Sequence, residues 1–152
     1  MGNDVLPSRR NVAVKQFSLF ADNKVGRMHD LIQALNAEEV TILGLCTVDT
    51  TDSAIMRVVV DYWECARERF RELGVNYALS DVVAVELPAA NDLAKVTAAL
   101  LQAEINIHYM YPLLTRPQSR CGLIIRLEDN EMAEQVLQQS GIKTLRHGDL
   151  AR

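Results

Sequence analysis

The sequence is poor in the residue patterns that mark several large classes of protein. Only 5% of its 152 residues are aromatic, and the 16 Lys and Arg residues are outnumbered by 20 Asp and Glu, which gives a formal charge of -4. Proteins that bind nucleic acid typically carry a basic surface, often with exposed aromatic rings. We therefore expect neither nucleic acid nor an anionic membrane surface among the partners.

Cysteines and long hydrophobic runs are also scarce. Cys46, Cys65 and Cys121 are widely spaced and odd in number, which argues against a disulfide framework or a zinc site and favours reduced thiols. No run approaches the roughly 18 apolar residues of a membrane span, and residues 1–10 lack the apolar core of a signal peptide. The sequence predicts a cytoplasmic protein without a bound metal.

Signatures of catalysis are missing as well. The sequence has no GxSxG, HExxH or Walker motif, and His29, His108 and His147 share no spacing. The segment from Asp22 to Arg27 offers too few cations for the phosphate cradle of an acylphosphatase-like enzyme. We predict that the chain is not an enzyme and has no catalytic residues or cofactor.

What the sequence does contain is an internal repeat. The apolar helical stripe that ends at Leu35 recurs at Leu100, 65 positions later, and the Phe70 to Gly74 segment recurs as Leu137 to Gly141, 67 positions later. A repeat of this length indicates two copies of one supersecondary unit. We assign residues 12–80 to the first module and residues 81–147 to the second, with only Ser80 and Asp81 between their strands.

The hydrophobic period changes in the same order within each copy. Alternation over residues 14–21 predicts a strand, and Met28, Leu31, Ile32 and Leu35 form the stripe of a helix that lies on a sheet. Further strands, a helix and a last short strand follow in each copy. The first copy has them at 40–48, 54–60, 63–73 and 75–79, and the second copy repeats the whole order at 82–87, 93–103, 105–114, 120–127, 131–140 and 142–145. The order βαββαβ predicts an α+β fold, the ferredoxin-like plait, with a four-stranded antiparallel sheet and both helices on one face.

The most informative loop is the one between the first strand and the first helix. Gly26 at this junction allows a positive φ, and the N–H groups of the first helical turn offer a site for a carboxylate. Asn106 is polar within an apolar strand start of the other copy, and its side chain could serve both the ammonium and the carboxylate of a free amino acid. Spacing alone favours the alternative, a turn-favouring residue where a strand begins.

The order of a strand, Asn-x-x-Gly-x-Met at 23–28, an apolar helix and a strand entered as Val-Thr-Ile or Ile-Asn-Ile resembles the ACT domain. The duplication is similar to that of free-standing tandem ACT-domain proteins. The resemblance implies two plaits that join side by side into one eight-stranded sheet with helices on one face, and a ligand site at the interface of the modules. The ligand-binding residues it implies are Asp22, Asn23, Val25, Gly26, Arg27 and Met28 from the first module, with Asn106, Ile107 and His108 from the second.

The sequence departs from the ACT pattern in both loops. Val25 stands where the family usually has Pro, and the second loop, from Pro88 to Leu93, has lost the Pro-Gly pair and is one residue shorter. Asn91 can adopt the left-handed conformation, but it has a side chain where the ligand would approach. We predict one competent site and one degenerate site.

The resemblance implies a non-catalytic regulatory module that binds a free amino acid. The alternative is a structural or partner-binding ACT pair whose ligand site has decayed. A homodimer is expected, and an enzyme of amino-acid metabolism would be the regulated partner.

Overall fold

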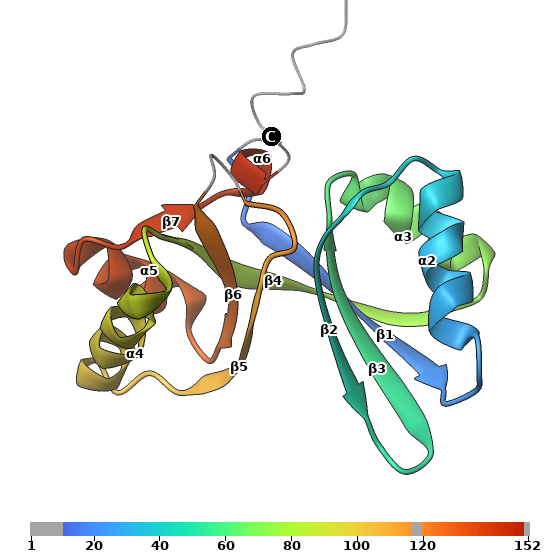
Figure 1. The fold of residues 1–152 in the computed structure, drawn as a ribbon, viewed down its shortest axis with the longest axis horizontal. Helices are drawn as coiled ribbons and strands as arrows, with labels where there is room; N and C mark the ends of the chain where they lie inside the picture. The colour runs from blue at the N-terminus through green and yellow to red at the C-terminus, as the bar shows by residue number, and fades with distance from the viewer. Residues whose placement is uncertain (1–10, 117–119, 151–152) are drawn as a thin grey trace, which may run out of the picture. The chain divides into compact units, whose positions relative to one another are not determined.

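The structure, a computed structural model, describes residues 11–116 and 120–150. It divides into two compact units (Figure 1). One unit comprises Lys15–Ser80, and the other comprises Asp81–Arg152 together with Met1–Val14, as far as these segments are described. No helix in the described ranges has the length and apolar character needed to cross a membrane.

The first unit follows the predicted order of strands and helices. Its elements are β1 (Val14–Asp22), α2 (Arg27–Ala37), β2 (Ile42–Asp49), β3 (Ser53–Val60), α3 (Trp63–Glu72) and the beginning of β4 (Asn76–Leu87). The strands lie in the order β2-β3-β1-β4. In the antiparallel pairing of β1 with β3, Leu19 lies opposite Met56 and Phe17 opposite Val58, so the apolar positions of both strands share one face.

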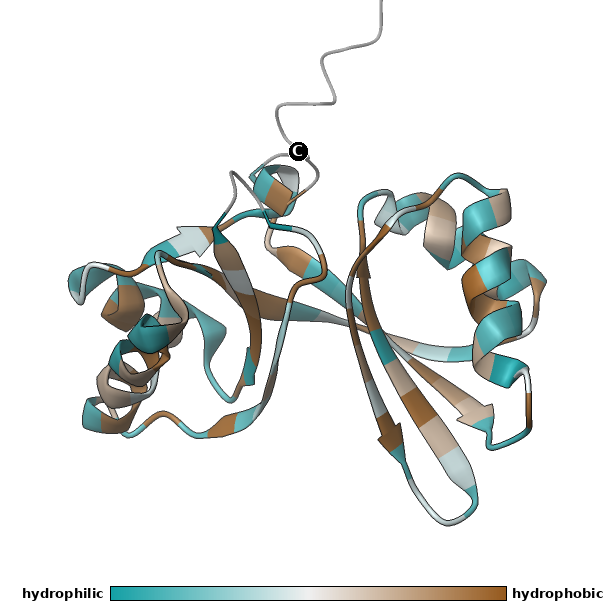
Figure 2. Ribbon diagram, in the orientation of Figure 1, coloured by the Kyte–Doolittle hydropathy of each residue, from teal (hydrophilic) through white to brown (hydrophobic). Residues whose placement is uncertain are grey.

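Helices α2 and α3 cover that apolar face (Figure 1). Leu31 and Leu35 of α2 and Phe70 of α3 are buried in one cluster with the strand residues. The rings of Phe17 and Phe70 meet edge to face with centroids 5.1 Å apart, a favourable aromatic geometry. In Figure 2, hydrophobic and hydrophilic bands alternate along the strands, as expected for a sheet with one covered face.

The second unit repeats this architecture. After β4 come η2 (Ala90–Asp92), α4 (Leu93–Gln102), β5 (Ile107–Pro112), β6 (Cys121–Leu127), α5 (Asn130–Gln139) and β7 (Lys143–Leu145). The end of β4 pairs antiparallel with both β6 and β7, and β5 pairs with β6. Val85, Leu100 and Leu137 are fully buried in the core between this sheet and α4 and α5.

The predicted fold class is confirmed, with one difference in the strand count. The sequence predicts eight strands, whereas the described residues contain seven, because β4 runs without interruption from Asn76 to Leu87. Ser80 and Asp81 lie inside this strand and do not separate two strands. Two polar residues without a glycine or proline do not break an extended backbone, so one strand serves both copies.

The helix ends repeat between the units. Glu39 after α2 and Glu104 after α4 have φ angles of 57° and 56°, and Gly74 and Gly141 after α3 and α5 have φ angles of 68° and 80°. The amides of the next residues then donate to carbonyls of the last turn, as from Val40 to Leu35. The repeat therefore extends to the backbone conformation that ends each helix.

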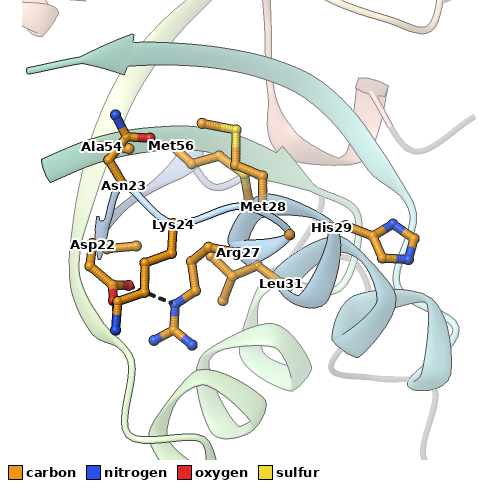
Figure 3. Close-up of a pocket in the computed structure, with 11 residues that line it drawn as sticks. Asp22, Asn23, Lys24, Arg27, Met28, His29, Leu31, Ala54 and Met56 are labelled. Carbon is orange, nitrogen blue, oxygen red and sulfur yellow. Dashed lines mark ion pairs between the residues drawn. The ribbon is translucent and has the colours of Figure 1, made fainter.

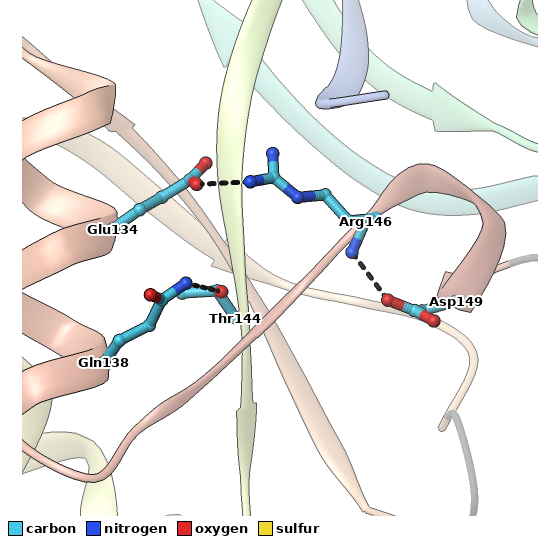
Figure 4. A network of polar contacts seen from close by, with 5 residues as sticks. All are labelled: Glu134, Gln138, Thr144, Arg146 and Asp149. Carbon is cyan, nitrogen blue, oxygen red and sulfur yellow. Dashed lines mark hydrogen bonds and ion pairs between the residues drawn. The ribbon is translucent and has the colours of Figure 1, made fainter. Parts of the chain in front are cut away.

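A short C-terminal helix, α6 (His147–Leu150), was not predicted. Arg146 holds it in place: its guanidinium donates to Glu134 at 2.9 Å and its backbone N–H donates to the Asp149 carboxylate at 2.8 Å (Figure 4). The backbone N–H of His147 donates to the carbonyl of Val12 at 3.1 Å. These bonds join α6 to α5 and to Val12 within the second unit, and His147 is buried there.

Candidate functional site

The loop between β1 and α2 is built around Gly26. This residue has a φ of 85°, and a Cβ added to it would meet nothing within 4 Å. Its backbone angle therefore explains the glycine, because residues with a Cβ rarely adopt the left-handed region. The N–H groups of Lys24 and Arg27 donate within the loop to the carbonyls of Asp22 and Lys24, at 3.0 and 3.1 Å. The loop is thus a short, internally bonded turn.

The N-terminus of α2 opens directly at this turn. The helix begins at Arg27, and no side chain caps it. The N–H of Asp30 donates to the Gly26 carbonyl at 3.0 Å, which starts the helical ladder. The amides of an uncapped first turn, together with the helix dipole, favour an anionic group at this end.

Charges of both signs surround the helix end. One oxygen of the Asp22 carboxylate lies 3.1 Å from Nζ of Lys24, and the other lies 3.3 Å from Nε of Arg27 (Figure 3). The hydrogen bond from Lys24 lowers the pKa of Asp22 from its ordinary value. All three side chains are well exposed, so they can exchange these partners for a ligand at little cost.

Asn23 links the loop to the hairpin between β2 and β3. Its Nδ2 donates to Oδ1 of Asp49 at 2.7 Å. Both side chains are exposed, and the bond uses the amide nitrogen of Asn23 and not its amide oxygen. The first residue of the loop is therefore tied to the β2–β3 hairpin.

A cavity of about 250 Å³ lies beneath this loop. Its floor is apolar and comes from β1, β3 and α2, and its rim is polar and comes from the loop (Figure 3). The lining residues are Ala21, Asp22, Asn23, Lys24, Gly26, Arg27, Met28, His29, Leu31, Ala54 and Met56. An apolar concavity with a few convergent polar groups is the usual form of a small-molecule site.

Five of the six residues predicted in this loop line the cavity. The exception is Val25, whose side chain points into solvent and is fully exposed. Sequence reasoning missed the floor, above all Ala54 and Met56. The alternation along β1 places Ala21 on the helix-facing side, but only the register between β1 and β3 brings Ala54 opposite it.

The residues predicted from the other module lie in the second unit. Asn106 precedes β5, is exposed, and accepts a hydrogen bond at its carbonyl from the N–H of Glu128 at 3.4 Å. Ile107 packs against the core of that unit, and His108 is exposed. The part that Asn106, Ile107 and His108 play in ligand binding stays a prediction.

The second loop has a different conformation. Residues Ala90–Asp92 form a turn of 3-10 helix, so Asn91 does not adopt the left-handed conformation that its residue type permits. The Asp92 carboxylate accepts the N–H of Ala89 and lies 3.0 Å from Nζ of Lys95. The hydrogen bond from Lys95 lowers the pKa of Asp92. The carboxylate of this loop is therefore paired with groups of the loop itself and of α4.

Other kinds of site find little support in the described ranges. These residues contain no group of three or more His, Cys, Asp and Glu arranged to hold a metal ion. The three cysteines are unpaired, and Cys65 is exposed. The cavity at the β1–α2 loop remains the candidate site.

Comparison with known proteins identifies the family of the chain. The family model described as the ACT domain pair matches residues 12–152. The crystal structure of protein BT0572 from Bacteroides thetaiotaomicron is similar, with 26% identity and a TM-score of 0.85, over 94% of this chain and 99% of that chain.

Two regulatory subunits of aspartate kinase share the fold. The ligand-free subunit from Thermus thermophilus has 20% identity and a TM-score of 0.61, over 86% of this chain and 93% of that one. The subunit from Thermus flavus has 18% identity and a TM-score of 0.58, over 86% and 94%. No curated protein sequence matches the chain significantly.

Proposed function

The chain belongs to the ACT domain pair family, and we propose that it is a non-catalytic regulatory module that binds a free amino acid at the loop between β1 and α2. Its likeness in fold to regulatory subunits of aspartate kinase supports a regulatory role. The partner that responds to the ligand would be an enzyme of amino-acid metabolism.

The observation that carries this proposal is the coincidence of the cavity with an uncapped helix end. A free amino acid presents a carboxylate and an ammonium close together. The carboxylate would bind the first-turn amides of α2 and a cation such as Arg27. The ammonium would bind the Asp22 carboxylate in place of Lys24. Both charges of the zwitterion thus have partners at one rim.

Ligand binding would act by shifting a conformational equilibrium. A ligand stabilises whichever arrangement binds it better, by no more than the difference in affinity. The loop is joined to the β2–β3 hairpin through Asn23 and Asp49, so occupation of the cavity would also restrain that hairpin. A partner enzyme that contacts the hairpin would sense this restraint.

The second candidate is a structural or partner-binding ACT pair with a decayed ligand site. The ion pairs of Asp22 with Lys24 and Arg27 favour it, because they already satisfy the charges that a ligand would use. The exposed Val25, which stands where the ACT pattern has Pro, also favours it. The homodimer and the cytoplasmic location remain predictions.

Thermal unfolding of the full chain with each of the twenty amino acids tests the proposal. A ligand at 100 times its dissociation constant stabilises the folded state by about 2.7 kcal/mol, which raises the melting temperature measurably. A rise with one chemical class is the expected result. No rise with any amino acid at millimolar concentration would support the second candidate.

Variants then locate the site. Asn23→Ala and Gly26→Ala should weaken the response, the first by freeing the loop from Asp49 and the second by straining the turn. Asn106→Ala tests the predicted contribution of the second module. Asn91→Ala, in the second loop, is the matched control and should leave the response unchanged.

A further inference from the structure

Two alanines face each other at the floor of the cavity. Ala21 of β1 lies directly opposite Ala54 of β3 in the antiparallel register. Both line the cavity beneath Met28 and Leu31 of α2. Directly opposite residues on one face have Cβ atoms about 5 Å apart. Two side chains that end at Cβ therefore leave open the space that longer side chains would fill.

The second unit fills the same place. The residues 66 and 67 positions further along the chain are Leu87 and Cys121, and they too lie opposite each other, in the pairing of β4 with β6. Leu87 is 6% exposed and belongs to the core of that unit, and Cys121 packs against the same core. The two pairs have the same register, so the floor of the first unit is open because its alanines are smaller than the leucine and cysteine of the second unit.

The floor of the cavity carries no charge. Leu31, Ala54 and Met56 are 3%, 6% and 2% exposed. The charged groups, Asp22, Lys24 and Arg27, lie at the rim, from the end of β1 to the start of α2, where they are paired and exposed. A charged ligand side chain that entered the floor would lose its water without gaining a partner, which is strongly unfavourable.

From this division we infer that the ligand is an amino acid with an uncharged aliphatic or thioether side chain. The side chain enters the space over the pair Ala21 and Ala54, and the zwitterionic end stays at the loop. Ala21 and Ala54 therefore determine specificity. The inference rests on the proposed amino-acid binding.

The size of the cavity agrees with such a side chain. A dry apolar cavity of about 150 Å³ is large enough to hold benzene. The 250 Å³ under this loop therefore accommodates the side chains of valine, leucine, isoleucine and methionine. Glycine and alanine would leave much of it unfilled.

Isothermal titration calorimetry of the full chain with a graded ligand series tests the inference. From alanine through valine to leucine, affinity should rise about fourfold for each added methylene-sized group. Glutamate, which matches methionine in length, and lysine, which is one atom longer, should both bind at least about tenfold more weakly than methionine.

The outcomes separate the inference from the proposed function. Binding of lysine or glutamate as tight as that of methionine would overturn the aliphatic class and leave amino-acid binding intact. Binding of none of the amino acids would refute the proposed function itself. A flat series from glycine to leucine would show that the side chain does not enter the cavity.

Substitution of the floor provides a second, independent test. Ala21→Leu copies Leu87 of the second unit and should weaken the binding of leucine and methionine by at least about tenfold, with a smaller effect on alanine. Ala98→Leu, at an exposed position of α4, is the matched control and should bind as the wild type does. Ala54→Val is the milder variant if Ala21→Leu does not fold. Unchanged leucine binding by either folded floor variant would overturn the role of these two alanines.

Discussion

The loops before α2 and α4 occupy equivalent places in two copies of one fold, and they differ in backbone conformation and in the pairing of their polar groups. The first has a left-handed glycine and a cavity of about 250 Å³ with an apolar floor. The second closes as a 3-10 turn whose amide at Ala89 is taken by Asp92. The copies agree in their core positions and helix ends, so the divergence is confined to the loop and the strand ends beside it.

A neighbouring position shows the same contrast. Glu86 of β4 is 6% exposed, and its two oxygens lie 3.2 Å from Nε of Arg120 and 3.4 Å from Nζ of Lys143. The equivalent residue in the first unit is Phe20, which is 45% exposed. The second unit thus ties β4 with charges to β7 and to the residue that precedes β6, whereas the equivalent strand end of the first unit is exposed. The buried position of the second unit is paired with two cations, whereas the equivalent position of the first unit is exposed to solvent.

The largest expected effect comes from exchanging the floor residues between the units. Leu87→Ala removes a buried leucine from the second core and should lower the free energy of unfolding by about 2 to 4 kcal/mol. The reverse exchange, Ala21→Leu, fills existing space in the first unit and should change it by less than about 1 kcal/mol. Urea denaturation of both variants measures this asymmetry. Equal losses would mean that the first floor is as closely packed as the second.

A smaller effect is expected from the buried carboxylate. Glu86→Gln leaves Arg120 and Lys143 without their anion, but these side chains are 55% and 60% exposed and can turn to water. The cost should therefore be about 1 to 2 kcal/mol, well below the 3 to 5 kcal/mol typical when both charges are buried. Phe20→Gln is the matched change in the first unit and should cost less than about 0.5 kcal/mol.

Urea denaturation at low and high salt distinguishes the electrostatic contribution of Glu86 to stability from its contribution through packing. The Glu86 contribution should shrink as salt screens the exposed cations, and the effect of Phe20→Gln should not depend on salt. A salt-independent loss for Glu86→Gln would show that the glutamate stabilises the unit through packing alone.

Much of the fold could be predicted from the sequence because its signals are local. The stripes through Leu35 and Leu100 predict the helices, and Gly26 predicts a special backbone at the first loop. The sequence does not predict that β4 is continuous, because Ser and Asp are common in turns and Ser80 and Asp81 therefore suggest a break. Neither residue prevents an extended backbone, and the strand runs through both. The short helix α6 was missed because the bonds of Arg146 to Glu134 and Asp149, which hold it, are partly tertiary.

The candidate site was only half predictable for the same reason. The rim lies in one short segment, from Asp22 to Met28, so spacing and residue type identify it. The floor depends on the register that places Ala54 opposite Ala21, and no local pattern marks two alanines 33 positions apart as neighbours. Register follows from the pairing of whole strands.

The smallest expected effect concerns the acid side of the stability curve. Hydrogen bonds from Lys24 and Lys95 hold the pKa of Asp22 and of Asp92 below the ordinary value. Because the folded pKa is the lower one, each carboxylate contributes its stabilisation above the unfolded pKa of about 4. It loses this contribution as the pH falls through the folded pKa. Asp22→Asn and Asp92→Asn should therefore each flatten the fall in melting temperature below about pH 4.

The two aspartates should differ at neutral pH, where the comparison of the loops is sharpest. Asp92→Asn weakens the acceptor for Ala89 as well as the ion pair with Lys95, so it should lower the melting temperature at pH 7. Asp22→Asn affects only exposed ion pairs, which contribute little, so it should leave the melting temperature nearly unchanged while removing the partner of a ligand's ammonium. Melting curves between pH 2.5 and 7 measure both effects. A larger loss for Asp22→Asn than for Asp92→Asn would mean that the first loop depends on its charges for stability, and it would contradict the assignment of those charges to ligand binding.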